Sequence, residues 1–396
     1  MKLLKNAKII DDENNSFKNV HILIDNKKIS KIYTNFNEIS VKIEEKDIIN
    51  LDNSVIIPGF INSQSYLMKN YYYNNFKNKD IDNFEENYNK FINSLSLEEK
   101  FNIYKIQILQ AIKNGVTTIC DEDLFNLPLK KAVKVSGINC VFKLGYNFSS
   151  DKLDETLISK MNNNEEFIFS LKNVLFNSEK NFASIIKLSK IYNKPILING
   201  TENLPMAGDI EKEFSLNNLS ILENLGLLDV NHIINNSNVL DKNEIELLNI
   251  YNSKLIFSPS LNLNFGNPNA NIYSLNKQNL IGISSFNNDY FLELFLARNL
   301  EKQGYNCLEV FSEKELINFS TINNAKILGL KNRGKIKEGY FADLIVLNNN
   351  SVNSLHSFIK NFDNRNIKSV FINGELVYNN AHFLNIKDYN KLVKNF

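Results

Sequence analysis

The chain has 396 residues and a formal net charge of +1, with 45 Lys and Arg residues against 44 Asp and Glu residues. This balance argues against the basic surface that nucleic-acid-binding proteins use to neutralise phosphates. Hydrophobic residues make up 43% of the chain and charged residues 22%, so the composition is that of a folded protein rather than a disordered or fibrous one. Only four His and three Cys residues are present, which leaves few ligands for a transition-metal site.

The sequence has no segment typical of membrane insertion or secretion. No run approaches the roughly 20 apolar residues of a spanning helix, and the first residues lack the small-residue cleavage site of a secretory signal. Cys120, Cys140 and Cys307 lie far apart and are odd in number, which fits reduced thiols better than a disulfide framework. We therefore expect a cytoplasmic protein whose partners include neither a membrane nor nucleic acid.

The first 57 residues alternate short β-rich runs with turn residues. Such runs occupy 2–10, 20–33 and 47–60, and a turn at Asp25-Asn26 divides the second of them. This spacing predicts a small, mostly antiparallel sheet.

The pattern changes at Ser96, which forms a capping box with Glu99 before an apolar-periodic stretch that runs to Gly115. The strand-like run GVTTICDED follows it. The same unit recurs, with helices expected at 178–192, after a cap of Asp241 and Glu244, and at 290–302, and with strands expected at 195–200, 253–260 and 279–285. Strands that alternate with helices in this way predict a parallel sheet, and a closed (β/α)₈ barrel suits the length.

After about Lys335 the chain becomes β-rich again. The run at 369–380 contains Asn373-Gly374 between two strand-like halves, which is a strong hairpin signal. Each terminal segment alone is too short for a sizeable core. Residues 1–57 and 336–396 are therefore expected to form one composite β-domain beside a barrel of residues 58–335.

The polar stretch 69–90 is expected to be a loop or lid insertion near the barrel mouth. Its aromatic cluster of Tyr71, Tyr72, Tyr73 and Phe76 is typical of a lid. The same cluster could equally pack within the core or against the partner subunit of a homodimer.

Eight segments in the same order along the chain resemble the amidohydrolase superfamily. They are VIIPGFINSQSY (55–66), AIKNGVTTICDE (111–122), PILINGTEN (195–203), LDKNEIELL (240–248), FSPSLNLNFG (257–266), STINNAKILGL (320–330), GKIKEGYFADLIVL (334–347) and SVFINGELVY (369–378). The pattern is most similar to the 5-methylthioadenosine/S-adenosylhomocysteine deaminase group and related aminohydrolases. The resemblance implies an α/β fold: a TIM-like (β/α)₈ barrel that carries one zinc or iron ion, flanked by a composite β-sandwich from both termini.

The resemblance also locates the metal-ligand positions, and the residues there are poor ligands. Gln64 and Tyr66 stand where the family has a His-x-His pair, Asn199 stands at a third His, and Phe286 stands at the Asp that ends the eighth strand. A Gln carbonyl is a weak donor, a Tyr hydroxyl must first lose a proton with a pKa near 10, and a phenyl ring cannot bind a metal. We therefore expect no metal ion and no other cofactor.

Several carboxylates could still recruit a metal ion. Asp289 lies three residues after Phe286, although it more simply begins the next helix as an N-terminal cap. Asp121, Glu122 and Asp123 follow the second predicted barrel strand.

Histidines do not replace the lost ligands. The family's substrate-facing His and the second His of its sixth-strand segment map onto Lys172 and Asn235. The four histidines of the chain are expected to be structural or surface residues away from the mouth: His21, His232, His356 and His382.

Polar side chains are expected to converge at the barrel mouth and to bind a small polar ligand. The expected pocket residues are Gln64, Tyr66, Lys172, Asn199, Glu202, Asn235, Ser285 and Phe286. The ring of Phe286 is expected to point toward Tyr66 and Gln64 and to fill the space of the metal ion. Glu202 and Lys172 are the candidate catalytic residues, since Glu202 alone keeps the family's acid/base position.

Two interpretations of function remain open at this point. In the first, the chain is a metal-free pseudoenzyme that has lost hydrolytic deamination and serves as a small-molecule-binding or assembly protein. Glu202 is then a vestige, a ligand contact, or half of an ion pair with Lys172. In the alternative, it is an active amidohydrolase with an atypical site that acts on non-peptide C–N bonds of a purine-like or cyclic amidine substrate.

Overall fold

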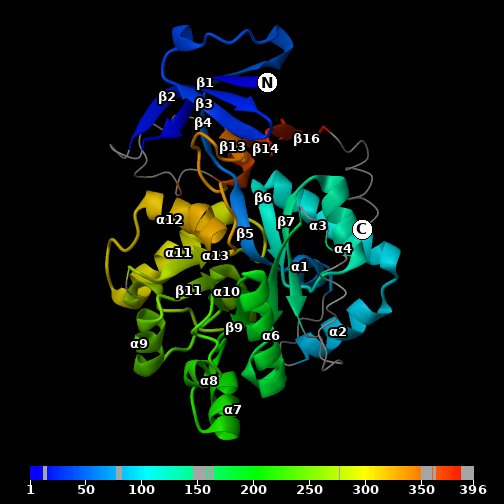
Figure 1. Ribbon diagram of the computed structural model, residues 1–396, viewed down its shortest axis with the longest axis vertical. Helices are drawn as coiled ribbons and strands as arrows, with labels where there is room; N and C mark the ends of the chain where they lie inside the picture. Colours follow the sequence, from blue (N-terminus) through cyan, green and yellow to red (C-terminus); the bar gives the residue numbers. More distant parts are fainter. Residues whose placement is uncertain are drawn as a thin grey trace.

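The computed structural model describes residues 1–11, 16–76, 83–145, 158, 161, 165–275, 277–348, 359 and 363–384. A β-sheet built from both ends of the chain lies against one end of an α/β barrel (Figure 1). The barrel strands run away from this sheet, so their C-terminal ends open on the opposite side.

The terminal sheet joins both ends of the chain in one ladder of eight strands, in the order β16-β15-β14-β13-β4-β1-β2-β3. Its strands are β1 (Lys2–Ile10), β2 (Phe17–Asp25), β3 (Lys28–Tyr33), β4 (Ile48–Pro58), β13 (Leu344–Leu347), β14 (Ile367–Ile372), β15 (Glu375–Asn379) and β16 (His382–Phe383). β4 pairs antiparallel with β13, with Val55 opposite Leu347. The amide of Ile29 donates to the carbonyl of Tyr340 at 2.8 Å, so the sheet curls back on itself around an apolar core. The two terminal segments therefore form the expected composite β-domain.

The predicted hairpin is present between β14 and β15. Asn373 and Gly374 have φ angles of 50° and 76°, as a tight two-residue turn with left-handed residues requires. The turn between β2 and β3 lies one residue later than predicted, at Asn26 and Lys27, whose φ angles are 44° and 72°.

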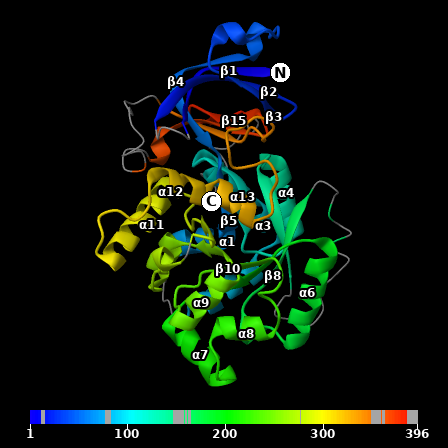
Figure 2. The same cartoon turned by 60° about the vertical axis from the view of Figure 1, so that its left-hand side comes forward.

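The barrel is a parallel ladder of eight strands in chain order (Figure 2). They are β5 (Phe60–Ser65), β6 (Val116–Asp121), β7 (Asn139–Gly145), β8 (Glu166–Leu171), β9 (Ile196–Asn199), β10 (His232–Asn235), β11 (Lys254–Phe257) and β12 (Leu280–Ile283). An apolar layer fills the interior with one side chain from each of seven strands: Ile61, Cys120, Val141, Ile168, Leu197, Ile233 and Ile256. This arrangement confirms the (β/α)₈ prediction.

Side chains close the seam between β5 and β12. Nδ2 of Asn324 donates to the carbonyls of Ile61 and Ile283, at 2.6 and 2.8 Å. The hydroxyl of Tyr290 contacts the same two carbonyls at 3.0 and 3.1 Å. These groups satisfy backbone acceptors that a continuous strand ladder would otherwise pair.

Helices surround the barrel and follow the predicted caps. They are α1 (Leu67–Asn75), α2 (Phe84–Ser94), α3 (Leu97–Lys113), α4 (Leu127–Ser136), α6 (Glu179–Tyr192), α7 (Leu204–Phe214), α8 (Asn218–Asn224), α9 (Lys242–Ile250), α10 (Pro259–Phe265), α11 (Tyr290–Tyr305), α12 (Glu313–Ser320) and α13 (Ile322–Ile327). Capping boxes begin α3 at Ser96 and α9 at Asp241. Within the described part of the chain, no helix is both long and apolar enough to cross a bilayer.

The stretch predicted to be a loop, 69–90, is mostly helical where it is described, in α1 and α2. Its polar composition obscures an apolar face: the ring of Tyr72 lies 5.4 Å from that of Phe84 and 5.1 Å from that of Phe91, centroid to centroid. Tyr72 thus belongs to the core between the two helices, and Tyr71 and Tyr73 pack against this core, whereas Phe76 is 41% exposed.

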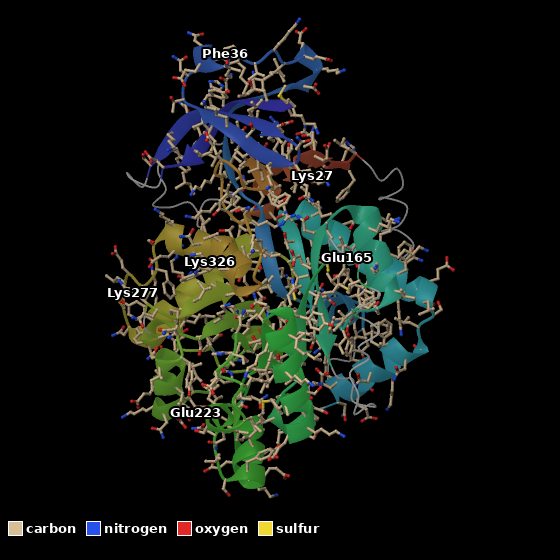
Figure 3. The ribbon with its side chains drawn as sticks, in the orientation of Figure 1. Lys27, Phe36, Glu165, Glu223, Lys277 and Lys326 are labelled. Carbon is tan, nitrogen blue, oxygen red and sulfur yellow. The ribbon has the colours of Figure 1, made fainter. Side chains whose placement is uncertain are left out.

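The long axis of the molecule separates the terminal sheet from the helices beyond the barrel mouth. Figure 3 shows Phe36 at the outer edge of that sheet and Glu223, on α8, near the opposite end. The barrel mouth is therefore remote from the terminal sheet.

Candidate binding site in the barrel mouth

A polar layer lies directly above the apolar layer of the barrel. Successive side chains of a strand point to opposite faces, so a residue two positions after an inward-facing one also faces inward. Two positions beyond the apolar layer come Lys143, Ser170, Asn199, Asn235 and Ser258. In TIM-like barrels this C-terminal end of the strands carries the functional groups.

Gln64, at the first predicted ligand position, contacts a buried lysine. The side-chain oxygen of Gln64 accepts a hydrogen bond from Nζ of Lys143. The residues are 1% and 2% exposed, and the pairing of β5 is irregular between Asn62 and Ser65. The position that a metal-binding imidazole would occupy is therefore next to an ammonium group.

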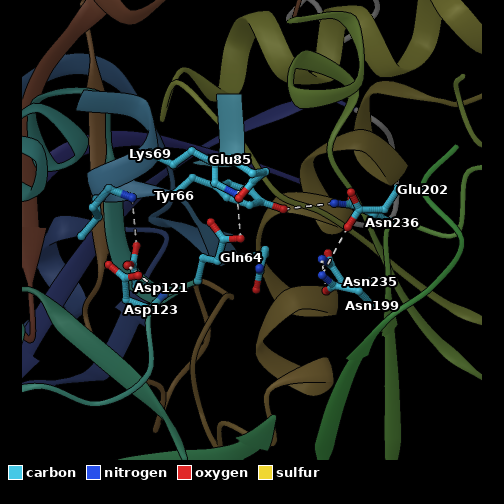
Figure 4. Close-up of polar contacts among 12 residues, drawn as sticks. Gln64, Tyr66, Lys69, Glu85, Asp121, Asp123, Asn199, Glu202, Asn235 and Asn236 are labelled. Carbon is cyan, nitrogen blue, oxygen red and sulfur yellow. Dashed lines mark hydrogen bonds and ion pairs between the residues drawn. The ribbon is translucent and has the colours of Figure 1, made fainter. Parts of the chain in front are cut away.

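Tyr66, at the second position, is buried and bonded to an amide. Its hydroxyl accepts a hydrogen bond from Nδ2 of Asn236 at 3.1 Å (Figure 4). Burial and the nearby carboxylates of Glu122 and Glu202 raise the pKa of Tyr66. The hydroxyl therefore stays protonated and is a poor metal ligand.

Asn199, at the third position, lies between two other polar side chains (Figure 4). Its Nδ2 donates to Glu202 at 3.2 Å, and its Oδ1 accepts from Asn235 at 3.0 Å. Burial raises the pKa of Glu202 to about 7. The predicted ion pair between Glu202 and Lys172 is not formed among the described residues. Glu202 is instead bonded to the neutral amide of Asn199, which compensates a negative charge less well than an ammonium group would.

Phe286, at the fourth position, is fully buried and packs with Tyr66 and Leu261. Its ring lies 5.7 Å from that of Tyr66, as the sequence predicted, and 5.6 Å from that of Tyr73. Asp289 accepts from the amide of Leu292 at 3.2 Å and caps α11. Phe286, and not Asp289, is therefore the residue that fills the end of the eighth strand.

A cavity of about 240 Å³ opens beside these groups, on the side of β6, β7 and β8. Among the residues that line it are Gln64, Lys69, Glu85, Glu122, Lys143, Ser170, Lys172 and Asn199. Of the predicted pocket residues, only Gln64, Lys172 and Asn199 line this cavity. Tyr66, Glu202, Asn235, Ser285 and Phe286 lie outside its lining, so the pocket is smaller than predicted and displaced from the aromatic side chains.

Lys69 crosslinks three elements at the cavity wall. Its Nζ lies 3.0 Å from a carboxylate oxygen of Glu85 on α2 and 3.0 Å from one of Glu122 after β6. Burial lowers the pKa of Lys69, but the two carboxylates outweigh burial and raise it overall. This cluster was not predicted from the sequence, because the stretch 69–90 was expected to be a loop.

The acids that follow β6 have structural partners. Asp121 accepts from the hydroxyl of Ser65 at 2.7 Å and from the amide of Leu67 at 3.0 Å, which supports the first turn of α1. Asp123 accepts from the hydroxyl of Tyr104 at 2.5 Å. Burial raises the pKa of Asp121 to about 7, with a further contribution from Asp123. These acids are engaged in the fold rather than grouped around an open position.

The described histidines lie away from the mouth. His21 lies in β2 and accepts from the amide of Asn6, and His382 lies in β16. His232 begins β10 at the far end of the barrel, with its ring nitrogens 3.0 Å from the carbonyl of Val230 and 2.9 Å from the hydroxyl of Ser253. His356 lies outside the described residues.

The sequence pattern of the Amidohydrolase family matches residues 55–377, most of the chain. This chain belongs to that family. A 5-methylthioadenosine/S-adenosylhomocysteine deaminase of Caldicellulosiruptor saccharolyticus is 26% identical over 420 residues, covering 99% of this chain and 96% of the relative. A 5'-deoxyadenosine deaminase of Methanococcus aeolicus is also 26% identical, covering 98% of this chain and 99% of the relative.

A solved structure has the same fold across nearly the whole amidohydrolase chain. The crystal structure of an adenosine deaminase from Xanthomonas campestris, with bound zinc, matches with a TM-score of 0.87 at 16% identity. The match covers 99% of this chain and 96% of that one.

The donor chemistry of this amidohydrolase mouth does not fit zinc or iron. The four ligand positions hold the amide of Gln64 bonded to an ammonium, the protonated phenol of Tyr66, the amide of Asn199 bonded to Glu202 and Asn235, and the phenyl ring of Phe286. Among the described residues, no group of three or more His, Cys, Asp or Glu side chains could hold a metal ion. A divalent cation beside Gln64 would also be repelled by Lys143.

Proposed function

We propose that this amidohydrolase-family protein binds a small polar ligand in its barrel mouth without a catalytic metal ion. The observation that carries the proposal is the contact between Lys143 and Gln64, which puts an ammonium group beside the first ligand position. Lys172 and Asn199 add further polar groups to the cavity wall.

Binding in the presence and absence of a chelator tests this proposal. The probe is 5'-deoxyadenosine, a substrate that the names of the relatives suggest, and calorimetry measures its dissociation constant. We expect the same constant with and without EDTA, and no ammonia release. Binding that EDTA abolishes would overturn the proposal.

A second candidate function is hydrolysis of a C–N bond in a purine-like or cyclic amidine substrate. The deaminase names of the relatives support it better than they support complete loss of activity. Glu202 is the specific observation in its favour, because a carboxyl with a pKa of about 7 exists in both protonation states near neutral pH. Water would add to the carbon that carries the amino group, and ammonia would leave as the C–N bond breaks.

Ammonia release from 5'-deoxyadenosine distinguishes the two functions. Turnover that persists in EDTA and is lost in Glu202→Gln would support the second candidate. Glu211→Gln, at an exposed position of α7, is the matched control and should behave as the wild-type protein does.

A further inference from the structure

Lys143 is a buried cation whose charge is not neutralised by a direct partner. It lies in β7, is 2% exposed, and lines the cavity. Among the described residues, its Nζ donates to the neutral amide oxygen of Gln64 and takes part in no ion pair. The carboxylates of Asp121 and Asp123 act on Lys143 electrostatically, but among the described residues they form no ion pair with it. Burying a charge that lacks a direct ion pair is costly, so such a group points to a partner that completes it.

The other cations of the cavity are arranged differently. Lys69 is held between the carboxylates of Glu85 and Glu122. Lys172 is exposed at the cavity wall, and its Nζ lies 5.2 Å from the centre of the ring of Phe176. Lys143 is therefore the cation that a ligand would meet at the base of the cavity.

The groups around Lys143 favour an acceptor with two oxygens. An ammonium has three N–H donors, and one of them is directed to Gln64. Because that contact uses Oε1 of Gln64, the amide presents its Nε2 donors on the other branch, and Nε2 has no partner among the described residues. Two neighbouring donors, one of them charged, match the two oxygens of a carboxylate.

The cavity disfavours a ligand that carries two negative charges. Glu85, Glu122 and Asp123 also line it, and they would repel a dianion. The volume of about 240 Å³ lies below the range of about 300–1,000 Å³ that is usual for drug-sized ligands, so the ligand is small.

We propose that the barrel mouth binds a small organic monocarboxylate, whose carboxylate is held by Nζ of Lys143 and the side-chain amide of Gln64. This inference rests on the proposed function, since it names the ligand class for the same metal-independent site. The ammonium of Lys143 supplies there the positive charge that a metal ion would otherwise supply.

Benzoate and benzamide form a matched pair of probes, because they share a shape and differ in charge. Calorimetry on the full-length protein should show benzoate binding at least tenfold more tightly than benzamide. Lys143→Met should weaken benzoate at least tenfold and leave benzamide unchanged. Its melting temperature should equal or exceed that of the wild-type protein, because the substitution removes a buried charge. Lys90→Met, at an exposed position of α2, is the control and should bind benzoate as the wild-type protein does.

Gln64→Glu provides a second, independent variant. The new carboxylate would pair with Lys143, so it should raise the melting temperature and abolish benzoate binding. If both this variant and Lys143→Met fail to fold, the contact is a structural requirement and the proposal is overturned.

Two further results would overturn the monocarboxylate proposal. One is equal affinity for benzoate and benzamide, and the other is unchanged benzoate binding in Lys143→Met. Repeating the binding measurements in EDTA distinguishes failure of the monocarboxylate proposal from failure of the proposed function. Benzoate binding that requires a metal ion would contradict both, whereas metal-independent 5'-deoxyadenosine binding without a preference for benzoate would contradict only the monocarboxylate.

Discussion

The barrel mouth has two halves with opposite chemistry. On the side of β6, β7 and β8 it is an open cavity lined by Lys69, Lys143 and Lys172 with their neighbouring carboxylates. On the other side, Tyr66 and Phe286 pack into an aromatic plug with Leu261, Tyr73 and Phe265. Two of the four ligand positions thus became packing residues, and a third, Gln64, became a partner of Lys143. The space of a metal site can therefore be filled on one side and kept open on the other.

The largest loss of unfolding free energy is expected from a substitution in the aromatic half. Phe286→Ala removes a fully buried ring and should cost about 3–5 kcal/mol of unfolding free energy. Denaturant titration measures it, and Phe214→Ala, at a 39% exposed position of α7, serves as the control. A loss of less than about 1 kcal/mol would mean that the plug is not packed as described.

In the charged half, Lys69→Met should lower the free energy of unfolding by a smaller amount, about 1–3 kcal/mol. The substitution leaves Glu85 and Glu122 without their cation, but both carboxylates are partly exposed and regain some hydration. Lys90→Met breaks only an exposed pair with Glu86 and should cost about 0.5 kcal/mol or less. Equal losses in the two variants would show that Lys69 is not a crosslink.

The carboxyl group of Glu202 should make stability depend on pH. Its pKa is raised in the folded protein from the ordinary value of 4.5 to about 7, so the folded state binds more protons than the unfolded state between these values. This group therefore makes the wild-type protein less stable as pH rises from about 4.5 to 7, by at most about 1.4 kcal/mol per pH unit. Glu202→Gln should remove this contribution, which is measured as the difference between two stability curves. Parallel curves would contradict the assigned pKa.

The sequence allowed much of this region to be predicted. Phe286 was placed against Tyr66 from the resemblance to the family. Asp289 was placed at the start of α11 because a carboxylate before an apolar helical run is a local capping signal. Lys143 was missed, although it stands two positions after the inward-facing Val141 in the apolar run NCVFKLG. That alternation was the available signal. The contact with Gln64 depends on the irregular register of β5, which no local pattern shows.

The Lys69 cluster could not be predicted from the sequence for another reason. Lys69, Glu85 and Glu122 belong to three separate elements, and the many Asn residues of the stretch 69–90 obscure the apolar faces of α1 and α2. Composition alone therefore favoured a loop where tertiary packing stabilises helices.

The smallest effect is expected at the border of the plug. Tyr66→Phe keeps the ring but removes the acceptor of Nδ2 of Asn236, and should cost about 1 kcal/mol. Thermal denaturation of the wild-type protein and of Tyr66→Phe checks this value. A more stable variant would mean that the hydroxyl is not satisfied by Asn236.

We propose that the cation of this mouth is the ammonium of Lys143 and not a metal ion. Elemental analysis of protein purified without chelator tests it most directly. We expect well under one equivalent of zinc, iron or manganese per chain. A full equivalent of metal that is lost in the double variant Gln64→Ala and Asn199→Ala would contradict it.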